Sequence, residues 1–176
     1  MKLVQKRSRK AGLPPGTLVH IGDKRPETVK ITVFDYDEHH FHERQVAKAE
    51  EIPMAPAPCV TWVDVGGVHQ LDVLETFGKM FGLHSLLLGD IANTDQRPNL
   101  VDYGSYGYVV LKMLYEGDRQ GDVIVEQVSL VYGDTFLLSF QENGGDVFQA
   151  VKDRLRSGKG RLRLAGSHYL LYALID

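Results

Sequence analysis

Short segments in which apolar and polar residues alternate recur along this chain, and a period of two is typical of half-buried β-strands. The expected strands lie at residues 29–34, 45–47, 60–65, 99–102, 106–115, 122–132 and 135–141. An acidic, histidine-rich stretch at 35–43 separates the first two, which we interpret as a hairpin or as two linked strands. Turn signals at Gly104-Ser105 and Gly133-Asp134 separate the later strands and predict a β-meander.

Apolar residues spaced three and four apart predict helices in other segments. These are 70–80, with Leu71, Leu74 and Phe77 inward; 85–93, with Leu87, Leu88 and Ile91 inward; the helix that follows Asn143-Gly144-Gly145-Asp146, with Val147, Val151 and Leu155 inward; and 159–176. Gly82 and Gly158 are placed to end the first and third of these helices, and Asp146 is placed to cap the start of the third.

The last helical segment carries the widest apolar face of the chain. One row consists of Leu164, His168, Leu171 and Ile175, and a second row beside it consists of Ala165, Tyr169 and Tyr172. A face of this width is expected to pack against other structure. The pattern runs into Asp176 without a capping glycine, a terminal basic residue or a proline, so we expect 159–176 to be the start of a truncated long helix. The chain would then be a fragment of a longer protein.

Strands and helices in this order predict an α/β fold, namely an α/β/α sandwich with a mixed β-sheet flanked by helices on both faces. We expect helices 70–80 and 85–93 to cover one face and the last two helices to cover the other. The α/β domain would comprise residues 17–158, preceded by a basic tail and a Pro-Gly linker at 1–16.

Composition narrows the classes of function. With 43% hydrophobic and 24% charged residues, the chain has the composition of a soluble globular domain. Its net charge of −3 argues against a general nucleic-acid binder, which needs a positive surplus to neutralise phosphates. The single cysteine, Cys59, excludes an intrachain disulfide, and the apolar run 169–175 is far shorter than the ~20 residues of a membrane-spanning helix. No apolar stretch follows the basic N-terminus, so we expect no secretory signal and a cytoplasmic location.

Enzyme motifs are absent from the sequence: it has no P-loop, no Gly-x-Ser-x-Gly and no His-Glu-x-x-His, and we expect no enzymatic activity. Metal-ligand chemistry is present. His40 and His42 would share one face of an extended segment and suit zinc, cobalt or nickel, unless 35–43 is only a polar hairpin loop. Carboxylates suited to hard cations are scattered, without a compact calcium loop, at Asp90, Asp95, Asp102 and Asp176.

Short motifs in a fixed order resemble one known family. They are Gly12-Leu13-Pro14-Pro15-Gly16-Thr17, Thr61-Trp62-Val63, Phe81-Gly82-Leu83-His84, Asp90-Ile91-x-Asn93, Gln96-Arg97-Pro98, Leu111-Lys112-Met113, Glu126-Gln127-Val128-Ser129-Leu130, Phe140-Gln141-Glu142, Gly145-Asp146-Val147-Phe148 and Tyr169-Leu170-Leu171-Tyr172-x-Leu174-Ile175-Asp176. Each motif alone is weak. Their order and spacing from Gly12 to Asp176 resemble the cytoplasmic N-terminal domain of the CorA family of magnesium and cobalt transport proteins.

The resemblance implies a regulatory, divalent-cation-sensing domain of an ion channel. The family's Gly-Met-Asn signature and its two transmembrane helices would lie beyond residue 176, so this fragment would not conduct ions itself. Five such domains surround the pore in the family. The implied partners are therefore neighbouring subunits of a homopentamer, with no nucleic acid. The full-length protein would lie at the cytoplasmic face of the inner membrane and contact the membrane only through the missing helices.

The family's cation sites lie between subunits. The resemblance matches the acidic residue of the Asp-Ile-x-Asn motif to Asp90 and implies that it faces an acidic residue on a neighbour's stalk helix. Asp176 would contribute to a second site nearby. The regulatory ligand would be Mg²⁺, with Co²⁺ or another divalent cation as the alternative. Many relatives carry glutamate immediately before the motif's aspartate, whereas Gly89 here leaves the second site without that ligand.

Two alternatives stay open. The zinc-transporting branch of the same superfamily shares the fold, and the pore sequence that would decide between the ions is not part of this chain. A free-standing α/β ligand-binding domain would instead be expected to have a crevice with convergent polar groups and a finished C-terminal helix.

Overall fold

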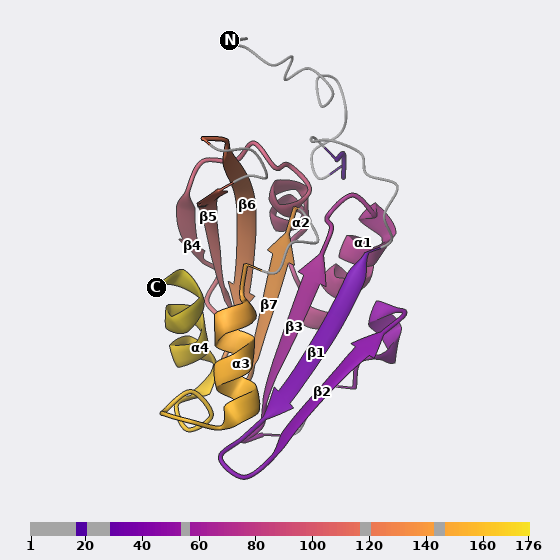
Figure 1. Ribbon diagram of the computed structural model, residues 1–176. Coiled ribbons are helices and arrows are strands. Elements are labelled where there is room, and N and C mark those ends of the chain that lie inside the picture. Colours follow the sequence, from indigo (N-terminus) through magenta and orange to yellow (C-terminus); the bar gives the residue numbers. More distant parts are fainter. Residues whose placement is uncertain (1–16, 21–28, 54–56, 117–120, 143–146) are drawn as a thin grey trace.

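The computed structural model describes residues 17–20, 29–53, 57–116, 121–142 and 147–176. In this part of the chain the strands form one seven-stranded sheet in the order β2-β1-β3-β7-β6-β5-β4 (Figure 1). The strands are β1 (Lys30–Tyr36), β2 (Phe41–Val46), β3 (Val60–Gly66), β4 (Asn99–Asp102), β5 (Gly107–Glu116), β6 (Val123–Tyr132) and β7 (Phe136–Gln141). The pair β3–β7 is parallel and the other pairs are antiparallel, which confirms the predicted mixed sheet.

The predicted loop at 35–43 is shorter than expected. β1 extends to Tyr36 and β2 begins at Phe41, so that Asp35 lies opposite His42 in an antiparallel ladder. The polar residues of this stretch can take strand conformation because β2 is an edge strand, whose side chains can remain in water while its main chain pairs with β1.

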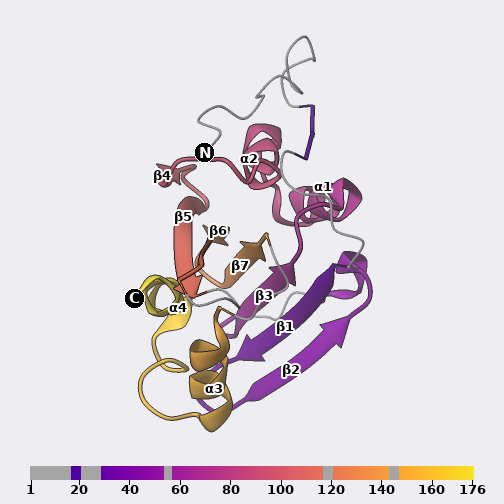
Figure 2. The ribbon, with the colours of Figure 1, turned by 45° about the horizontal axis from the view of Figure 1, so that its top comes forward.

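Helices cover both faces of the sheet, as predicted. They are α1 (Leu71–Phe81), α2 (Ser85–Ile91), α3 (Gln149–Ser157) and α4 (Gly166–Ile175), with a short 3-10 helix, η2, at Ala49–Glu51. Figure 2 shows α1 and α2 on one side of the sheet and α3 and α4 on the other. Gly82 ends α1 and Gly158 ends α3, and both have the left-handed backbone conformation that glycine adopts without a steric penalty.

Each face of the sheet has its own hydrophobic core. The first core lies between the sheet and the helices α1 and α2, and its buried residues include Val63, Val65, Leu74, Phe77, Leu87, Leu88 and Ile91. The second core lies between the sheet and the helices α3 and α4, and its buried residues include Phe34, Trp62, Val128, Leu130, Val151, Leu155, Leu170 and Leu174. Alternation along β3 sends Trp62 to the second core and Val63 to the first, so the central strand is buried on both sides.

The prediction for the last helix was wrong in two respects. α4 begins at Gly166 and not at Lys159, and its buried residues are Ser167, Leu170 and Leu174. Both predicted inward rows contain exposed members: Leu164 (58% exposed), Tyr172 (59%) and Ile175 (49%).

The reason lies in the turn between α3 and α4. Its Leu162 is fully buried, and the Arg163 guanidinium donates to the main-chain oxygen of Leu155 at the end of α3. The Ser167 hydroxyl donates to the main-chain oxygen of Gly133 at 2.6 Å, so that side of α4 faces the sheet. The predicted cap of α3, Asp146, lies outside the described residues.

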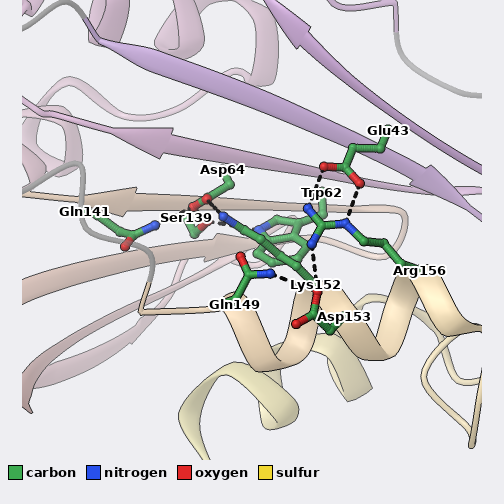
Figure 3. A network of polar contacts seen from close by, with 9 residues as sticks. All are labelled: Glu43, Trp62, Asp64, Ser139, Gln141, Gln149, Lys152, Asp153 and Arg156. Carbon is green, nitrogen blue, oxygen red and sulfur yellow. Dashed lines mark hydrogen bonds and ion pairs between the residues drawn. The ribbon is translucent and has the colours of Figure 1, made fainter.

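A polar network lies inside the second core (Figure 3). Lys152 of α3 places its Nζ 2.6 Å from Oδ2 of Asp64 on β3, and each side chain is 7% exposed. Asp64 Oδ1 accepts from Ser139 Oγ at 2.6 Å and from Gln141 Nε2 at 2.8 Å, and Trp62 Nε1 donates to Ser139 Oγ at 2.9 Å. The apolar stripe predicted for this helix did not include Lys152. The charge is accommodated because hydrogen bonds surround its partner.

A second ion pair joins the same helix to the edge of the sheet. The Arg156 guanidinium donates to both carboxylate oxygens of Glu43 on β2, at 2.8 Å each, and the two side chains are 39% and 29% exposed. The hydrogen bonds from Arg156 are the main reason why the pKa of Glu43 lies below its ordinary value of 4.5.

We expect Arg156→Gln to lower the free energy of unfolding near pH 7, because it removes the ion pair with Glu43. The loss should be only about 0.5–1 kcal/mol, because water screens the pair. A carboxyl group whose pKa is lowered in the folded state contributes stability above its unfolded pKa and loses it as the pH falls through the folded value. The difference between variant and parent should therefore be steady above about pH 5 and shrink below it. Urea unfolding at a series of pH values measures this, with exposed Arg154→Gln on the same helix as the control. A difference that grew on acidification would contradict the assignment.

Candidate cation-binding sites

Asp90 lies in the last turn of α2 and is half-buried. Its Oδ1 accepts a hydrogen bond from Gln96 Nε2 at 2.7 Å. The last turn of α2 contains no basic residue, and the free carbonyl groups at a helix C-terminus carry partial negative charge. A carboxylate at this end of the helix therefore adds to a negative potential that favours a cation.

The charge of Asp90 contributes to the raised pKa values of two tyrosines, Tyr103 and Tyr108. Burial is the main cause of the raised pKa of Tyr103, and the negative charges of Tyr106 and Asp90 raise it further. Burial also raises the pKa of Tyr108, against a hydrogen bond with Ser129, and Asp90 again adds to the increase. Since both pKa values include a contribution from the same carboxylate, Asp90 lies near Tyr103 of the β4–β5 turn and buried Tyr108 of β5.

The segment that follows α2 is attached to the sheet by side chains. Gln127 of β6 accepts from the main-chain N–H of Gln96 at 2.9 Å and donates to the main-chain oxygen of Asn93 at 2.9 Å. Lys112 of β5 donates to the main-chain oxygen of Thr94 at 2.7 Å. The residue that contacts the Asp90 carboxylate is therefore itself held in place by the sheet.

Asp176 lies at the end of α4 and is exposed, and its Oδ1 accepts from the Tyr172 hydroxyl at 3.4 Å. α4 packs on the sheet face opposite to that of α2, so one chain does not bring Asp176 together with Asp90. Gly89 is buried within α2 and has no side chain to offer a cation. Each aspartate would therefore depend on ligands from elsewhere for a complete site, as the resemblance implies for sites between subunits.

The histidines lie apart from both aspartates, at the turn between β1 and β2. His40 Nδ1 is 3.0 Å from both carboxylate oxygens of Asp37, and His42 Nδ1 is 3.2 Å from Nη1 of Arg44. Hydrogen bonds from the His39 main chain and from His40 lower the pKa of Asp37. A guanidinium beside His42 opposes a cation there by charge repulsion. The metal role of His40 and His42 stays a prediction.

Within the described ranges, no group of three or more histidine, cysteine or acidic residues is arranged to hold a metal ion. Oxygen donors from one or two carboxylates nevertheless suit Mg²⁺, which retains most of its water ligands. A single aspartate such as Asp90 fits a hydrated magnesium ion better than it fits zinc, which takes four protein or water ligands in a tight tetrahedron.

The sequence analysis did not predict that the residues supporting Asp90 lie together. Gln96, Lys112 and Gln127 stand in the motifs that carry the resemblance, but nothing in their spacing joins them. In the observed register Lys112 lies directly opposite Gln127, as a polar pair inside two apolar strands. The predicted bounds of these strands, 106–115 and 122–132, do not fix that register.

In the described part of the chain, no helix combines the length and the apolar character needed to cross a bilayer. This agrees with the short apolar runs of the sequence.

Known proteins were compared with this chain in sequence and in fold. The family model described as CorA-like Mg²⁺ transporter protein matches residues 59–176. The cobalt/magnesium transport protein CorA of Thermotoga maritima is 40% identical over 170 residues, which cover 96% of this chain and 48% of the relative. The chain therefore spans about half the length of this relative.

Solved structures show the same fold. The full-length CmaX protein superposes with a TM-score of 0.65 at 15% identity, covering 87% of this chain and 45% of that one. The complete CorA magnesium transporter of Methanocaldococcus jannaschii gives a TM-score of 0.59 at 14% identity, covering 85% of this chain and 44% of that one. At such identities the likeness concerns the fold alone.

Proposed function

The chain belongs to the family of CorA-like Mg²⁺ transporter proteins, and we propose that it is the cytoplasmic, cation-sensing domain of a magnesium and cobalt transporter. In the full-length protein, five copies would surround a pore formed by segments outside this chain. Divalent cations would bind between neighbouring copies and hold the pore closed. The observation that carries the proposal is the Asp90 carboxylate, which a fixed amide orients at the end of α2 with no basic residue in the last turn.

Electrostatics explains how such a site could act. Two carboxylates about 4 Å apart repel each other by roughly 4 kcal/mol at an effective dielectric constant near 20. A divalent cation between Asp90 and an acidic residue of a neighbouring copy would turn this repulsion into attraction. When the cytoplasmic cation concentration falls, the sites would empty and the subunits would separate enough to open the pore.

Weak binding is a requirement of this mechanism. A sensor of an abundant ion has to bind it on the order of millimolar, which corresponds to roughly 4 kcal/mol per site. One carboxylate from each side, with the remaining ligands supplied by water, fits that weakness. We assign Asp90 the main role and Asp176 the smaller one, because Gly89 has no side chain to contribute to the second site that the resemblance implies.

Asp90→Asn in the full-length protein tests the proposal. The substitution removes the charge but keeps an oxygen that can accept from Gln96. We expect the magnesium concentration needed to protect the protein against proteolysis to rise at least about tenfold, or protection to be lost, since about 1.4 kcal/mol of lost attraction per site is already a factor of ten.

Asp72→Asn is the matched control, because Asp72 is an exposed aspartate at the start of α1, whose helix packs on the same sheet face. It changes the charge by the same amount and should leave magnesium protection as in the parent. If Asp90→Asn left the magnesium dependence unchanged, Asp90 would not be a sensor ligand.

A further inference from the structure

The loop between α2 and β4 is fixed by two polar side chains that come from β5 and β6, the two strands next to β4 in the sheet. Lys112 and Gln127 lie directly opposite each other on β5 and β6. Gln127 is 3% exposed and uses both ends of its amide, since its Oε1 accepts from the Gln96 N–H and from Lys112 Nζ while its Nε2 donates to the Asn93 oxygen. Lys112 Nζ also donates to the Thr94 oxygen.

This arrangement defines one orientation of the amide. Turning the Gln127 amide over would place its NH₂ group against two donors, the Gln96 N–H and the Lys112 ammonium, and would leave a carbonyl facing the Asn93 oxygen. With these three unfavourable contacts, the turned orientation would have a much higher free energy than the observed one, in which every partner is satisfied. The main chain from Asn93 to Gln96 is therefore set by the sheet.

Gln96 links the fixed loop to the Asp90 carboxylate. Its main-chain N–H is bound by Gln127, and its side-chain Nε2 donates to Asp90 Oδ1 at 2.7 Å. Asp90 itself lies in the last turn of α2, and the bond from Gln96 restricts the rotamers that its carboxylate can take. A hydrogen bond to a charged group fixes both its partners more strongly than a neutral one does.

We propose that Gln96, held by Gln127 and Lys112, is the positioning residue that orients the Asp90 carboxylate for cation binding between subunits. This inference rests on the proposed sensor role of Asp90. Gln127 and Lys112 of the sheet hold the loop, and Gln96 of the loop holds the Asp90 carboxylate. Because an ion held through few protein ligands gains little from each, an ordered carboxylate binds it at a lower concentration than a mobile one.

Gln96→Met in the full-length protein removes the contact with Asp90 but keeps the main-chain N–H that Gln127 binds. We expect the magnesium concentration for half-maximal protection against proteolysis to rise about three- to tenfold, with the denaturation midpoint in the absence of magnesium unchanged. Gln127→Met should raise the magnesium concentration similarly and also lower that midpoint, because it leaves buried partners without hydrogen bonds.

Two controls separate positioning from general destabilisation. Val128→Ala alters the neighbouring residue on β6, which faces the other core, and it should lower the midpoint without changing the magnesium dependence. Combined with Asp90→Asn, Gln96→Met should have no further effect on the magnesium response, since the carboxylate that it orients is gone.

The outcomes distinguish the two levels of the argument. If Asp90→Asn leaves protection unchanged, the proposed function itself fails. If Asp90→Asn weakens protection but Gln96→Met does not, the sensor role stands and the positioning inference is overturned. Equal shifts from Gln96→Met with and without Asp90→Asn would also overturn it, because the effect would then not act through Asp90.

Discussion

Replacing Lys152 with methionine is expected to destabilise the domain by about 3–5 kcal/mol, a large part of the stability of an ordinary domain. The substitution preserves much of the packing but leaves the Asp64 carboxylate, which is 7% exposed, without its cation. The remaining hydrogen bonds from Ser139 and Gln141 cannot replace a charge at 2.6 Å. Urea unfolding followed by circular dichroism measures the loss.

The matched control is Arg154→Met, which removes the same charge from an exposed position on the same helix and should change stability by less than about 0.5 kcal/mol. The double variant Asp64→Leu and Lys152→Met removes both charges, and it should recover most of the loss because no unpaired charge stays buried. A loss below about 1 kcal/mol for Lys152→Met alone would mean that the Asp64 carboxylate reaches water in the variant.

Trp62→Ala is expected to cost a similar amount, about 3–5 kcal/mol, for a different reason. Trp62 is fully buried on β3, with its ring stacked on Phe34 at 4.7 Å between centroids and edge-on to Phe148 at 6.2 Å. Alanine would leave a large cavity in the second core and would remove the donor to Ser139. Circular dichroism is again the measurement, because Trp62 is the only tryptophan and fluorescence would be lost with it.

Trp62→Phe is the control that separates volume from hydrogen bonding. It keeps an aromatic ring beside Phe34 and loses the indole N–H, so we expect a smaller cost of about 1–2 kcal/mol. Equal losses for the two substitutions would show that the bond to Ser139, and not the packing of the ring, dominates at this position.

The fold could be predicted from the residues themselves, whereas the candidate site could not. The sandwich with helices on both faces agrees with the two periodicities, because the side chains of a strand or helix emerge at fixed intervals and helices on both faces of a sheet bury the apolar faces of both. The candidate site came from resemblance alone. Nothing in the spacing of Asp90 and Asp176 marks them as ligands, since a carboxylate binds an ion only in combination with partners that lie far away in sequence.

The last helix shows where periodicity stops being informative. Apolar residues occupy most of α4, so several stripes were compatible with the pattern, and the row through Leu164, His168, Leu171 and Ile175 was the wrong one. Buried Leu162 in the turn before the helix and the bond from Ser167, in the first turn of α4, to Gly133 set the rotation of the helix. A helix that is hydrophobic on more than one side does not identify its own buried face.

The order of strands and helices and the glycines that end α1 and α3 were determined by the sequence itself, because each depends on backbone preferences within a few residues. Tertiary structure alone decided that Lys152 is buried, that Gln96 touches Asp90, and that Lys112 and Gln127 hold the loop between them. These contacts join residues from different elements, and their energies come from burial and from charges brought together in space.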